Sequence, residues 1–503
     1  MARLLTPEQM TQAEQTSEQL GTPLWTLMLN AGNALASMIK SRAAERRAKK
    51  ILFLCGKGNN GGDGFVAAAK LKGGDLKIKV KLMCGMPTTE LAKRAYNLLE
   101  SKDFIDIAVN YDADIIVDCI FGLGFKGEFD DLLAAELYEI SLKPAYRIAC
   151  DMPSGINCCN GEAAAETLFC DETLTMHAPK LGMYLRPAKS FCGKISVADI
   201  SIPNNWAAQL DDDTIIETAE PEYLKKLFPY RNEVDHKNRF GRLLMICGSE
   251  NYVGAAAIAS RAALRSGCGI VQLAAPKFVI QCISGNAPEC VYTPLPSDDE
   301  GFISEEAIPR LNELIDGADA VVIGCGLGCT EGTMKIVEEI VKKCRVPLVI
   351  DADGINQLAK HIDVLREKKC EIILTPHIAE LARLCATDNA DAKLHRYRLA
   401  RELCFKYEVT VHAKDATSIT IKDRLAYVTD FGTSALAKGG SGDMLAGIIG
   451  SLLAQGLKPR TACMLGDYIM GSTAELLSDR YSPAAITASD IISAFKDTLT
   501  KIS

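Results

Sequence analysis

Short apolar segments alternate with longer amphipathic stretches along most of the chain, a pattern typical of parallel α/β folds. The strands expected in the first half are Ile51–Cys55, Ile78–Met83, Ile115–Ile120 and Arg147–Cys150. Those expected in the second half are Leu243–Cys247, Ile270–Leu273, Ala320–Ile323, Leu348–Ile350, Ile372–Leu374 and Val409–His412. Because ligands bind at the carboxyl ends of the strands in such sheets, we expect the functional residues there.

The stretch Pro203–Asp235 interrupts this alternation with prolines and mixed charge. A chain of 503 residues is long enough for two hydrophobic cores of ordinary size. We therefore predict two α/β domains in tandem, residues 1–210 and residues 225–503. The helices expected between the strands of the first domain include Phe65–Leu71, Thr89–Glu100 and Asp131–Leu142.

Composition excludes several classes of protein. The net charge of −8 argues against a partner that is a nucleic acid, which would call for a basic surface. No apolar run is long enough to span a membrane, and the N-terminus lacks the apolar segment of a signal peptide. The 19 cysteines form no Cys-x-x-Cys and fit reduced, buried thiols, so we expect a cytoplasmic protein without structural zinc.

Two glycine-rich segments follow expected strands of the first half. Gly58–Gly64 comes after Ile51–Cys55 and contains polar side chains that favour ligand contact. Gly122–Gly127 is a formal G-x-G-x-x-G, which read alone indicates a dinucleotide-binding dehydrogenase with Asp151 as its ribose-binding acid. That alternative leaves Gly58–Gly64 without a role. Asn60, Asp118 and Ser154 add hard oxygen ligands, which suit an alkali or alkaline-earth ion.

Gly58–Gly64, Val117–Gly124 and Asp151–Gly155 together resemble the YjeF N-terminal family, the NAD(P)H-hydrate epimerases. The resemblance implies a Rossmann-like three-layer domain, with K⁺ bound by Asn60, Asp118 and Ser154. It implies Asp151 as the acid/base and Lys180, which matches a family lysine, as a further catalytic residue, with a solvated loop lysine as the alternative for Lys180. The residues that it assigns to the dinucleotide are Asn59, Asn60, Gly61, Gly62, Asp63, Gly122, Leu123, Gly124, Phe125, Lys126, Gly127, Glu128 and Asp151. Lys57 departs from the small residue or proline that is usual in the family. The same fold also serves as a non-catalytic module in an mRNA-decapping scaffold.

The second half carries the strongest phosphate-binding signal, Lys438–Asp443. Its glycines can turn backbone N–H groups onto an anion, and the apolar run that follows is typical of a helix whose N-terminus adds its dipole. Asp443 is placed to take a proton from a hydroxyl that faces the same phosphate. Other strand ends carry Gly324–Gly328, the carboxylates of Asp351 and Asp353, and His377.

These motifs resemble in their order the YjeF C-terminal family, the ADP- or ATP-dependent NAD(P)H-hydrate dehydratases of the ribokinase-like superfamily. The resemblance implies Asp443 as the base. It assigns the hydrated dinucleotide to Ala255, Gly328, His377 and Asp443. It assigns ADP or ATP, with Mg²⁺, to Lys414, Asp415, Ala416, Thr417, Ser418 and Gly442. Three departures are Cys325 for proline, Ile378-Ala379 for Pro-Gly, and Asp415 for glycine. A carboxylate at position 415 is unfavourable near phosphate unless it points away or meets Mg²⁺.

The two resemblances predict a bifunctional repair enzyme whose substrates are hydrated NADH and NADPH (NADHX and NADPHX) and ADP or ATP. The fused arrangement, similar to bacterial and archaeal members, favours ADP, and we expect a homo-oligomer. Two alternatives stay open on the sequence alone. One is a small-molecule kinase whose N-terminal domain only binds ligand, and the other is a non-enzymatic nucleotide-sensing or scaffold protein.

Overall fold

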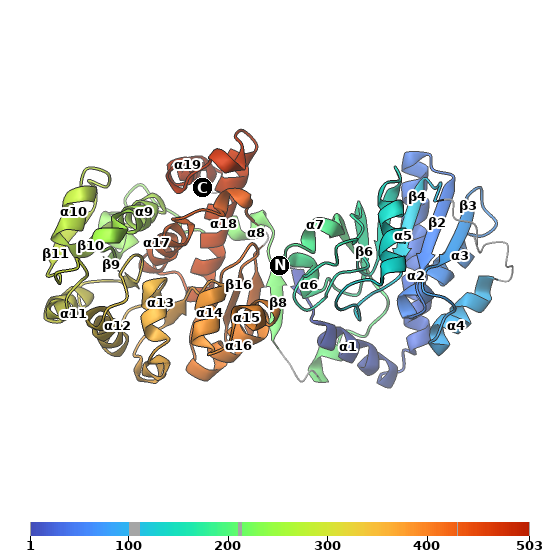
Figure 1. Ribbon diagram of the computed structural model, residues 1–503, viewed down its shortest axis with the longest axis horizontal. Helices are drawn as coiled ribbons and strands as arrows, with labels where there is room; N and C mark the ends of the chain where they lie inside the picture. Colours follow the sequence, from blue (N-terminus) through green and yellow to red (C-terminus); the bar gives the residue numbers. More distant parts are fainter. Residues whose placement is uncertain (1, 100–110, 210–213, 430, 502–503) are drawn as a thin grey trace. The chain divides into compact units, whose positions relative to one another are not determined.

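A computed structural model describes residues 2–99, 111–209, 214–429 and 431–501. The chain divides into two compact units, one containing Arg3–Ile216 and the other containing Glu217–Ser503 (Figure 1). The division falls inside the stretch Pro203–Asp235, whereas residue 210, the expected limit of the first domain, lies outside the described residues. The limits 1–210 and 225–503 therefore stay predictions. Among the helices of the described ranges, none is long and apolar enough to cross a membrane.

The N-terminal unit is built on a six-stranded parallel sheet with the order β3-β2-β4-β5-β6-β7. Its strands are β2 (Lys50–Cys55), β3 (Lys77–Leu82), β4 (Ile115–Cys119), β5 (Tyr146–Cys150), β6 (Glu172–Met176) and β7 (Lys194–Ala198). Its helices are α1 (Pro7–Gln19), α2 (Leu24–Arg46), α3 (Asn59–Leu71), α4 (Glu90–Tyr96), α5 (Asp131–Ser141), α6 (Leu181–Tyr184) and α7 (Lys189–Cys192). The strand order reverses between β2 and β4, which is where ligands bind in such sheets.

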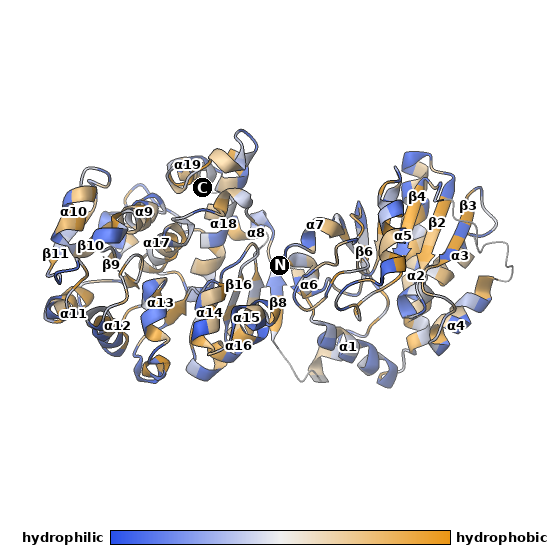
Figure 2. Ribbon diagram, viewed as in Figure 1, coloured by the Kyte–Doolittle hydropathy of each residue, from blue (hydrophilic) through white to orange (hydrophobic). Residues whose placement is uncertain are grey.

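Alternate side chains of β2 build two separate cores, as the two-residue period of a strand requires. Phe53 packs in the core that α1, α2 and α3 cover. Leu52 and Leu54 pack in the core that α5 covers on the other face. The result is the three-layer arrangement expected, and Figure 2 shows β2 and β4 as mostly hydrophobic.

The C-terminal unit is built on an eleven-stranded mixed sheet with the order β1-β8-β17-β16-β15-β14-β13-β12-β9-β10-β11. Its strands are β1 (Ala2–Leu4), β8 (Ile215–Thr218), β9 (Arg242–Ile246), β10 (Ile270–Pro276), β11 (Val291–Leu295), β12 (Ala320–Ile323), β13 (Leu348–Ile350), β14 (Ile372–Leu374), β15 (Thr410–Ala413), β16 (Ile419–Lys422) and β17 (Leu425–Val428). The strands from β9 to β15 are parallel, and β15, β16 and β17 pair antiparallel. The order reverses between β9 and β12.

Helices cover this sheet as they cover the first one (Figure 1). They are α8 (Pro221–Lys225), α9 (Val253–Arg265), α10 (Lys277–Ile283), α11 (Ile308–Ile315), α12 (Glu331–Lys343), α13 (Asp353–Leu358), α14 (Ile378–Leu384), α15 (Asn389–Leu394), α16 (Arg396–Tyr407), α17 (Ser441–Ala454), α18 (Pro459–Ser478) and α19 (Ala488–Thr500). The alanines of α9 and the apolar face of α17 pack with α18 and α19 against Leu243, Met245 and Val322 of the sheet.

The expected strands are present, with ends displaced by a few residues, but others were missed. β6 carries Glu172, Thr173 and Thr175, polar residues that the apolar pattern does not recognise as a buried strand. Its Glu172 is buried, and its charge is compensated by Arg42, whose Nε donates to Oε2 at 2.6 Å. The helix expected to begin at Phe65 begins at Asn59. Part of the expected helix Thr89–Glu100 lies outside the described residues.

Candidate active sites

The first candidate site lies where β2 ends and α3 begins, and the glycine-rich sequence forms the first turn of α3. Packing explains several of its glycines. A Cβ on Gly61 would lie 2.0 Å from the carbonyl oxygen of Gly56, and one on Gly62 would lie 2.6 Å from Cε of Met28. Gly58, at the N-cap, faces open space. The first N–H groups of a helix have no partner within it, so this turn can receive an anion.

A cavity of about 480 Å³ opens beside this turn. The predicted residues in its wall are Asn59, Asn60, Asp63, Gly122, Leu123, Gly124, Phe125 and Asp151. Gly61 and Gly62 are buried in the packing behind it, and Lys126, Gly127 and Glu128 lie exposed on the following loop. Lys57, the departure from the family pattern, is exposed and lines the cavity.

Asp151 presents one carboxylate oxygen to the cavity and has the other one fixed. It follows β5 with φ of +64°, which is uncommon for a residue with a side chain. Its Oδ1 accepts hydrogen bonds at 3.2 Å from Thr175 Oγ1 and from the Met176 N–H, and a further one from Lys180 Nζ. A Cβ on Gly122 would lie 3.5 Å from Oδ2. Oδ2 therefore faces Gly122 in the cavity wall.

Lys180 holds Asp151 from within the protein. Its side chain is fully buried, and Nζ donates to Thr175 Oγ1 at 2.8 Å and to the Met176 carbonyl at 3.1 Å as well as to Asp151. A buried charge needs such a partner set. The geometry makes Lys180 a group that positions Asp151 and balances its charge.

The cavity wall contains a further acid to which the sequence patterns did not point, Glu14 of α1. Burial, followed by the charge of Asp151, raises the pKa of Glu14 to about 7. The same causes raise the pKa of Asp63 well above its usual value. The sequence pattern that could have pointed to Glu14 is its spacing. It follows Met10 by one helical turn and therefore lies on the buried face of α1.

The proposed ion ligands lie at the ends of β4 and β5 and on α3. Asp118 accepts from the Ser154 N–H at 2.7 Å and from Ser154 Oγ at 2.5 Å, and is buried. The side-chain oxygen and nitrogen of Asn60 are both buried and have no hydrogen-bond partner among the described residues. A buried amide of this kind fits a residue that contacts a ligand.

Gly122–Gly127 does not have the context of a dehydrogenase motif. The segment forms turns after β4 and opens no helix within the described chain. The phosphate-binding fingerprint requires a strand, the glycines and a helix in direct succession. This structural difference removes the support for a dehydrogenase.

The second candidate site centres on Asp351, at the end of β13. Its Oδ1 accepts from Lys414 Nζ and from Thr375 Oγ1, both at 2.6 Å, and the residue is 1% exposed. These partners follow β15 and β14, the two next strands of the parallel part of the sheet. The sequence indicated Asp351 only as a carboxylate at a strand end, whereas the structure makes it the residue that fixes Lys414.

Gly442 and Asp443 lie in the first turn of α17, beside this pair. A Cβ on Gly442 would lie 3.4 Å from Lys414 Nζ and 3.9 Å from Asp351 Oδ2. One carboxylate oxygen of Asp443, one of Asp351 and the Sγ of Cys325 lie within 4.8 Å of one another. Burial and the charge of Asp351 raise the pKa of Asp443 to about 6, against the opposing effect of Lys414. The turn thus joins helix N–H groups, a cation and a carboxyl whose pKa is about 6.

His377 is the N-cap of α14, which accounts for its position without a ligand. Its Nδ1 accepts from the Ala379 backbone N–H at 3.1 Å, and the backbone N–H of His377 donates to Glu380 Oε2 at 2.9 Å. The imidazole is half-exposed, and burial followed by the charge of Lys414 lowers its pKa. Contact with the dinucleotide stays a prediction for this residue.

The segment after β15 contains Asp415, which stands where the family usually has glycine. Asp415 forms an ion pair at 3.0 Å with Arg396, which is 7% exposed. Its Oδ1 also accepts from the Ala416 N–H at 2.8 Å. The carboxylate is therefore compensated by the protein. Thr417 and Ser418 are buried, whereas Asp415 and Ala416 are exposed.

The structure places Ala255, in the first turn of α9, beside Gly326 of the loop that also contains Gly328. The Gly328 N–H donates to Asp353 Oδ2 at 2.9 Å, and a Cβ on Gly328 would lie 2.2 Å from Phe302. The Cβ of Ala255 would lie 2.9 Å from a Cβ on Gly326. Close packing therefore explains the small residues here, and their contact with a dinucleotide stays a prediction.

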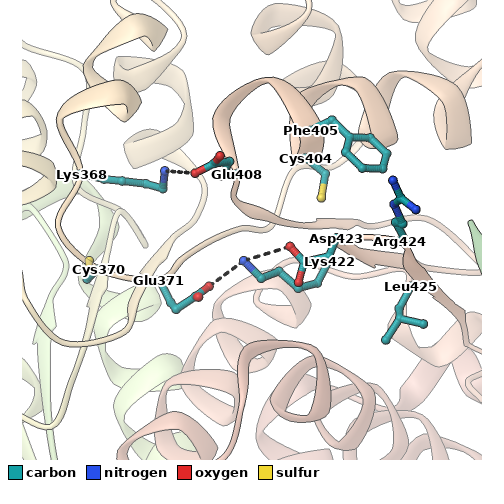
Figure 3. A pocket seen from close by; sticks show the side chains of 10 residues that line it. All are labelled: Lys368, Cys370, Glu371, Cys404, Phe405, Glu408, Lys422, Asp423, Arg424 and Leu425. Atoms are coloured by element: carbon teal, nitrogen blue, oxygen red, sulfur yellow. Dashed lines mark ion pairs between the residues drawn. The ribbon is translucent and has the colours of Figure 1, made fainter.

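A separate cavity of about 620 Å³ lies at the opposite ends of the strands (Figure 3). Lys368 and Glu371 precede β14, and Lys422 ends β16. Lys422 pairs with Glu371 at 2.9 Å, and Lys368 pairs with Glu408 at 4.0 Å. These charged groups pair with one another at the amino end of β14, away from Asp351. We therefore assign the cavity no part in the second site.

Each of the two sheets has a candidate site at the carboxyl ends of its strands. The fold is therefore that of an α/β protein with two separate candidate active sites. The sequence family described as YjeF-related protein N-terminus matches residues 25–182, and the family described as NAD(P)H-hydrate dehydratase matches residues 243–497. The bifunctional NAD(P)H-hydrate repair enzyme Nnr of Moorella thermoacetica is 33% identical, over 97% of this chain and 95% of its own. That of Escherichia coli is 31% identical, over 96% and 91%. The chain belongs to this family of bifunctional NAD(P)H-hydrate repair enzymes.

Solved structures agree on the fold of the C-terminal unit. A ribokinase-like protein from Enterococcus faecalis aligns with a TM-score of 0.50 at 21% identity, over 57% of this chain and 96% of its own. A protein from Streptococcus mutans aligns with a TM-score of 0.50 at 25% identity, over 57% and 100%. The comparisons confirm both resemblances that the sequence motifs indicated.

Proposed function

We propose that the cavity beside Asp151 is where the N-terminal unit interconverts the R and S epimers of NADHX and NADPHX. The reacting carbon, C6 of the hydrated ring, carries a hydroxyl and is bonded to the ring nitrogen. Loss of water assisted by the nitrogen lone pair, and return of water to the other face, inverts it. Asp151 Oδ2 exchanges the proton, and what supports this role is that Lys180, Thr175 and the Met176 N–H fix Oδ1.

The residues around Asn60 fit K⁺. Asn60 contributes an amide that has no hydrogen-bond partner among the described residues, and Asp118 and Ser154 contribute hard oxygens. K⁺ bound by these three residues would supply a positive charge where the dinucleotide phosphates approach. Asn60, Asp118 and Ser154 come from α3, β4 and the loop after β5, so this contact would tie the three segments together.

The C-terminal unit dehydrates the S epimer at the expense of ADP or ATP. Asp443 accepts the proton of the C6 hydroxyl, and the oxygen attacks the terminal phosphorus of the nucleotide, which releases AMP or ADP. The ring nitrogen then expels phosphate as the C6–O bond breaks, and loss of a C5 proton gives NADH or NADPH. The observation that supports this most directly is the placement of Asp443 in the first turn of α17, beside Lys414.

The remaining contacts follow from this chemistry. Lys414, Gly442 and the segment Asp415–Ser418 bind the nucleotide, while Gly328, His377 and Ala255 contact the dinucleotide. Mg²⁺ would be held by Asp351, whose hard oxygen fits it, together with the phosphates of the nucleotide, and there it would neutralise phosphate charge. We expect ADP to be preferred over ATP. We also expect a homo-oligomer, which light scattering would test.

The test uses the full chain and each epimer separately. With S-NADHX, absorbance at 340 nm should recover when ADP or ATP is added and should not recover without nucleotide. With R-NADHX and no nucleotide, chromatography should show S-NADHX forming faster than it does in buffer. Absence of the first result would contradict the dehydratase assignment, and absence of the second would contradict the epimerase assignment.

A further inference from the structure

We propose that Glu14 is a second catalytic carboxyl of the epimerase site, which protonates the hydroxyl that leaves C6 while Asp151 receives a proton on the opposite side. The inference rests on the proposed epimerisation. It goes beyond it by assigning a role to α1, which lies before residue 25, where the YjeF-related match begins.

The structure aims Glu14 at the cavity. Met10 and Glu14 are one turn apart on α1 and both line the wall. α1 begins at a capping box in which Thr6 and Gln9 exchange hydrogen bonds of 3.1 and 3.2 Å. These contacts fix where the helix starts and therefore which face carries Glu14.

The start of α1 is also tied to the segment that supplies Lys180. The Leu5 N–H donates to the Pro179 carbonyl, and the Leu181 N–H donates to the Leu5 carbonyl, both at 2.9 Å. The strand-like pairing of Leu5 with Lys180 places the origin of α1 beside the lysine that holds Asp151. One backbone link thus sets the positions of both carboxyls.

The two carboxyls differ in their contact with the buried lysine. Glu14, Asp63 and Asp151 line one cavity, and the buried cation that faces them is Lys180. One ammonium group can offset only one carboxylate, and Lys180 is bonded to Asp151. Asp151 is therefore the carboxyl placed to act as the base. Glu14 has no such bond to Lys180 among the described contacts, and burial followed by the charge of Asp151 raises its pKa to about 7. Burial also raises the pKa of Asp63.

The reaction requires one carboxyl that gives a proton and one that accepts a proton. Glu14 gives its proton to the C6 hydroxyl, the C6–O bond breaks, and water leaves as the nitrogen lone pair forms the C6–N double bond. Another water adds to the opposite face, and Asp151 Oδ2 takes its proton as the new C6–O bond forms. One water is released and one is consumed, and proton exchange with solvent restores both carboxyls. Asp63 does not take part in these steps.

The test is Glu14→Gln in the full chain, with Glu18→Gln as the matched control. Glu18 lies one turn further along α1 and is exposed. Exchange between R- and S-NADHX should fall by roughly 100-fold or more in Glu14→Gln, the range for loss of one general acid. It should be unchanged in Glu18→Gln. Dehydration of S-NADHX by the C-terminal unit should stay at the wild-type rate in both, which shows that the chain is folded.

The pH profile adds a readout that a structural role would not give. Wild-type exchange should fall as pH rises through about 7, because Glu14 loses its proton there. Glu14→Asp, which keeps a carboxyl, should retain that alkaline limb, and the residual exchange of Glu14→Gln should lack it. Exchange by Glu14→Gln within threefold of wild type, or with the alkaline limb intact, overturns the inference alone. A wild-type chain that does not accelerate exchange overturns the epimerase assignment as well.

Discussion

The two units use the same sheet geometry and differ in where the lysine of each site lies. In each unit a helix begins at a glycine-containing turn, α3 in the first and α17 in the second, and a carboxylate lies at a strand end beside it. In the first cavity three carboxyls share one buried lysine. In the second site Lys414 pairs with Asp351 beside the turn of Gly442, with Asp443 and Glu380 close to this pair. Both sites therefore hold more carboxyls than lysines, which suits the movement of protons. The second site differs in that its lysine lies at a helix N-terminus, which suits the transfer of phosphate.

The largest effect is expected when the base of the second site alone is removed, which tests whether the two sites act independently. Asp443→Asn should lower dehydration of S-NADHX by about 10³-fold, within the range for loss of a general base, because the hydroxyl can no longer be deprotonated as it attacks phosphorus. Recovery of absorbance at 340 nm with saturating nucleotide measures it. Epimer exchange should not change, and neither activity should change in Asp497→Asn, an exposed residue of α19. Loss of both activities in Asp443→Asn would contradict the separation of the sites.

The reciprocal change tests the first site. Asp151→Asn should lower epimer exchange by about 10²-fold or more, because the oxygen facing Gly122 can no longer accept a proton. Chromatographic separation of the epimers over time measures the exchange. Dehydration of pure S-NADHX should be preserved. If exchange continued at the wild-type rate, Asp151 would not be the acid/base.

The pH dependence should differ between the two activities. Asp443 acts as a base only when it is ionised, and its pKa is raised to about 6 by burial and by Asp351. Dehydration should therefore be constant above pH 7 and fall about tenfold per pH unit below about 6, as protonation removes the base. Initial rates with S-NADHX across pH 5 to 8 test this. A rate that rises as pH falls from 6 to 5 would exclude Asp443 as the base.

The smallest effect is expected at position 415 of the second site. Because Arg396 compensates the carboxylate of Asp415, Asp415→Asn should change the KM for ADP by less than about threefold, under 1 kcal/mol. An affinity gain of tenfold or more would show instead that Asp415 repels the nucleotide. The measurement is the KM for ADP at saturating S-NADHX.

The sequence predicted the strand edges well because a strand that ends at glycine or an acid carries its signal locally. It also located Asp118, Asp151 and Asp351 at those edges, and Asp443 at the start of a helix. It did not predict that α3 starts at Asn59, since glycine disfavours helix and only packing against Gly56 and Met28 explains the turn.

The remaining contacts depend on residues far apart in the chain, which a local pattern cannot reveal. Arg396 and Asp415 belong to different elements, and so do Lys414 and Asp351. Glu14 faces the cavity only because Leu5 pairs beside Lys180, more than 170 residues away. His377 shows the converse, since a residue predicted for a ligand is also explained by capping α14.

The most direct test of two cooperating sites is the extent of NADH recovery from a mixture of R- and S-NADHX of known ratio. With nucleotide present, the wild-type chain should restore absorbance at 340 nm beyond the S fraction, faster than spontaneous exchange allows. The Asp151→Asn chain should recover the S fraction at the wild-type rate and then slow to the spontaneous rate. A wild-type chain that also stops at the S fraction would contradict the account, because the first site would then contribute no epimerisation.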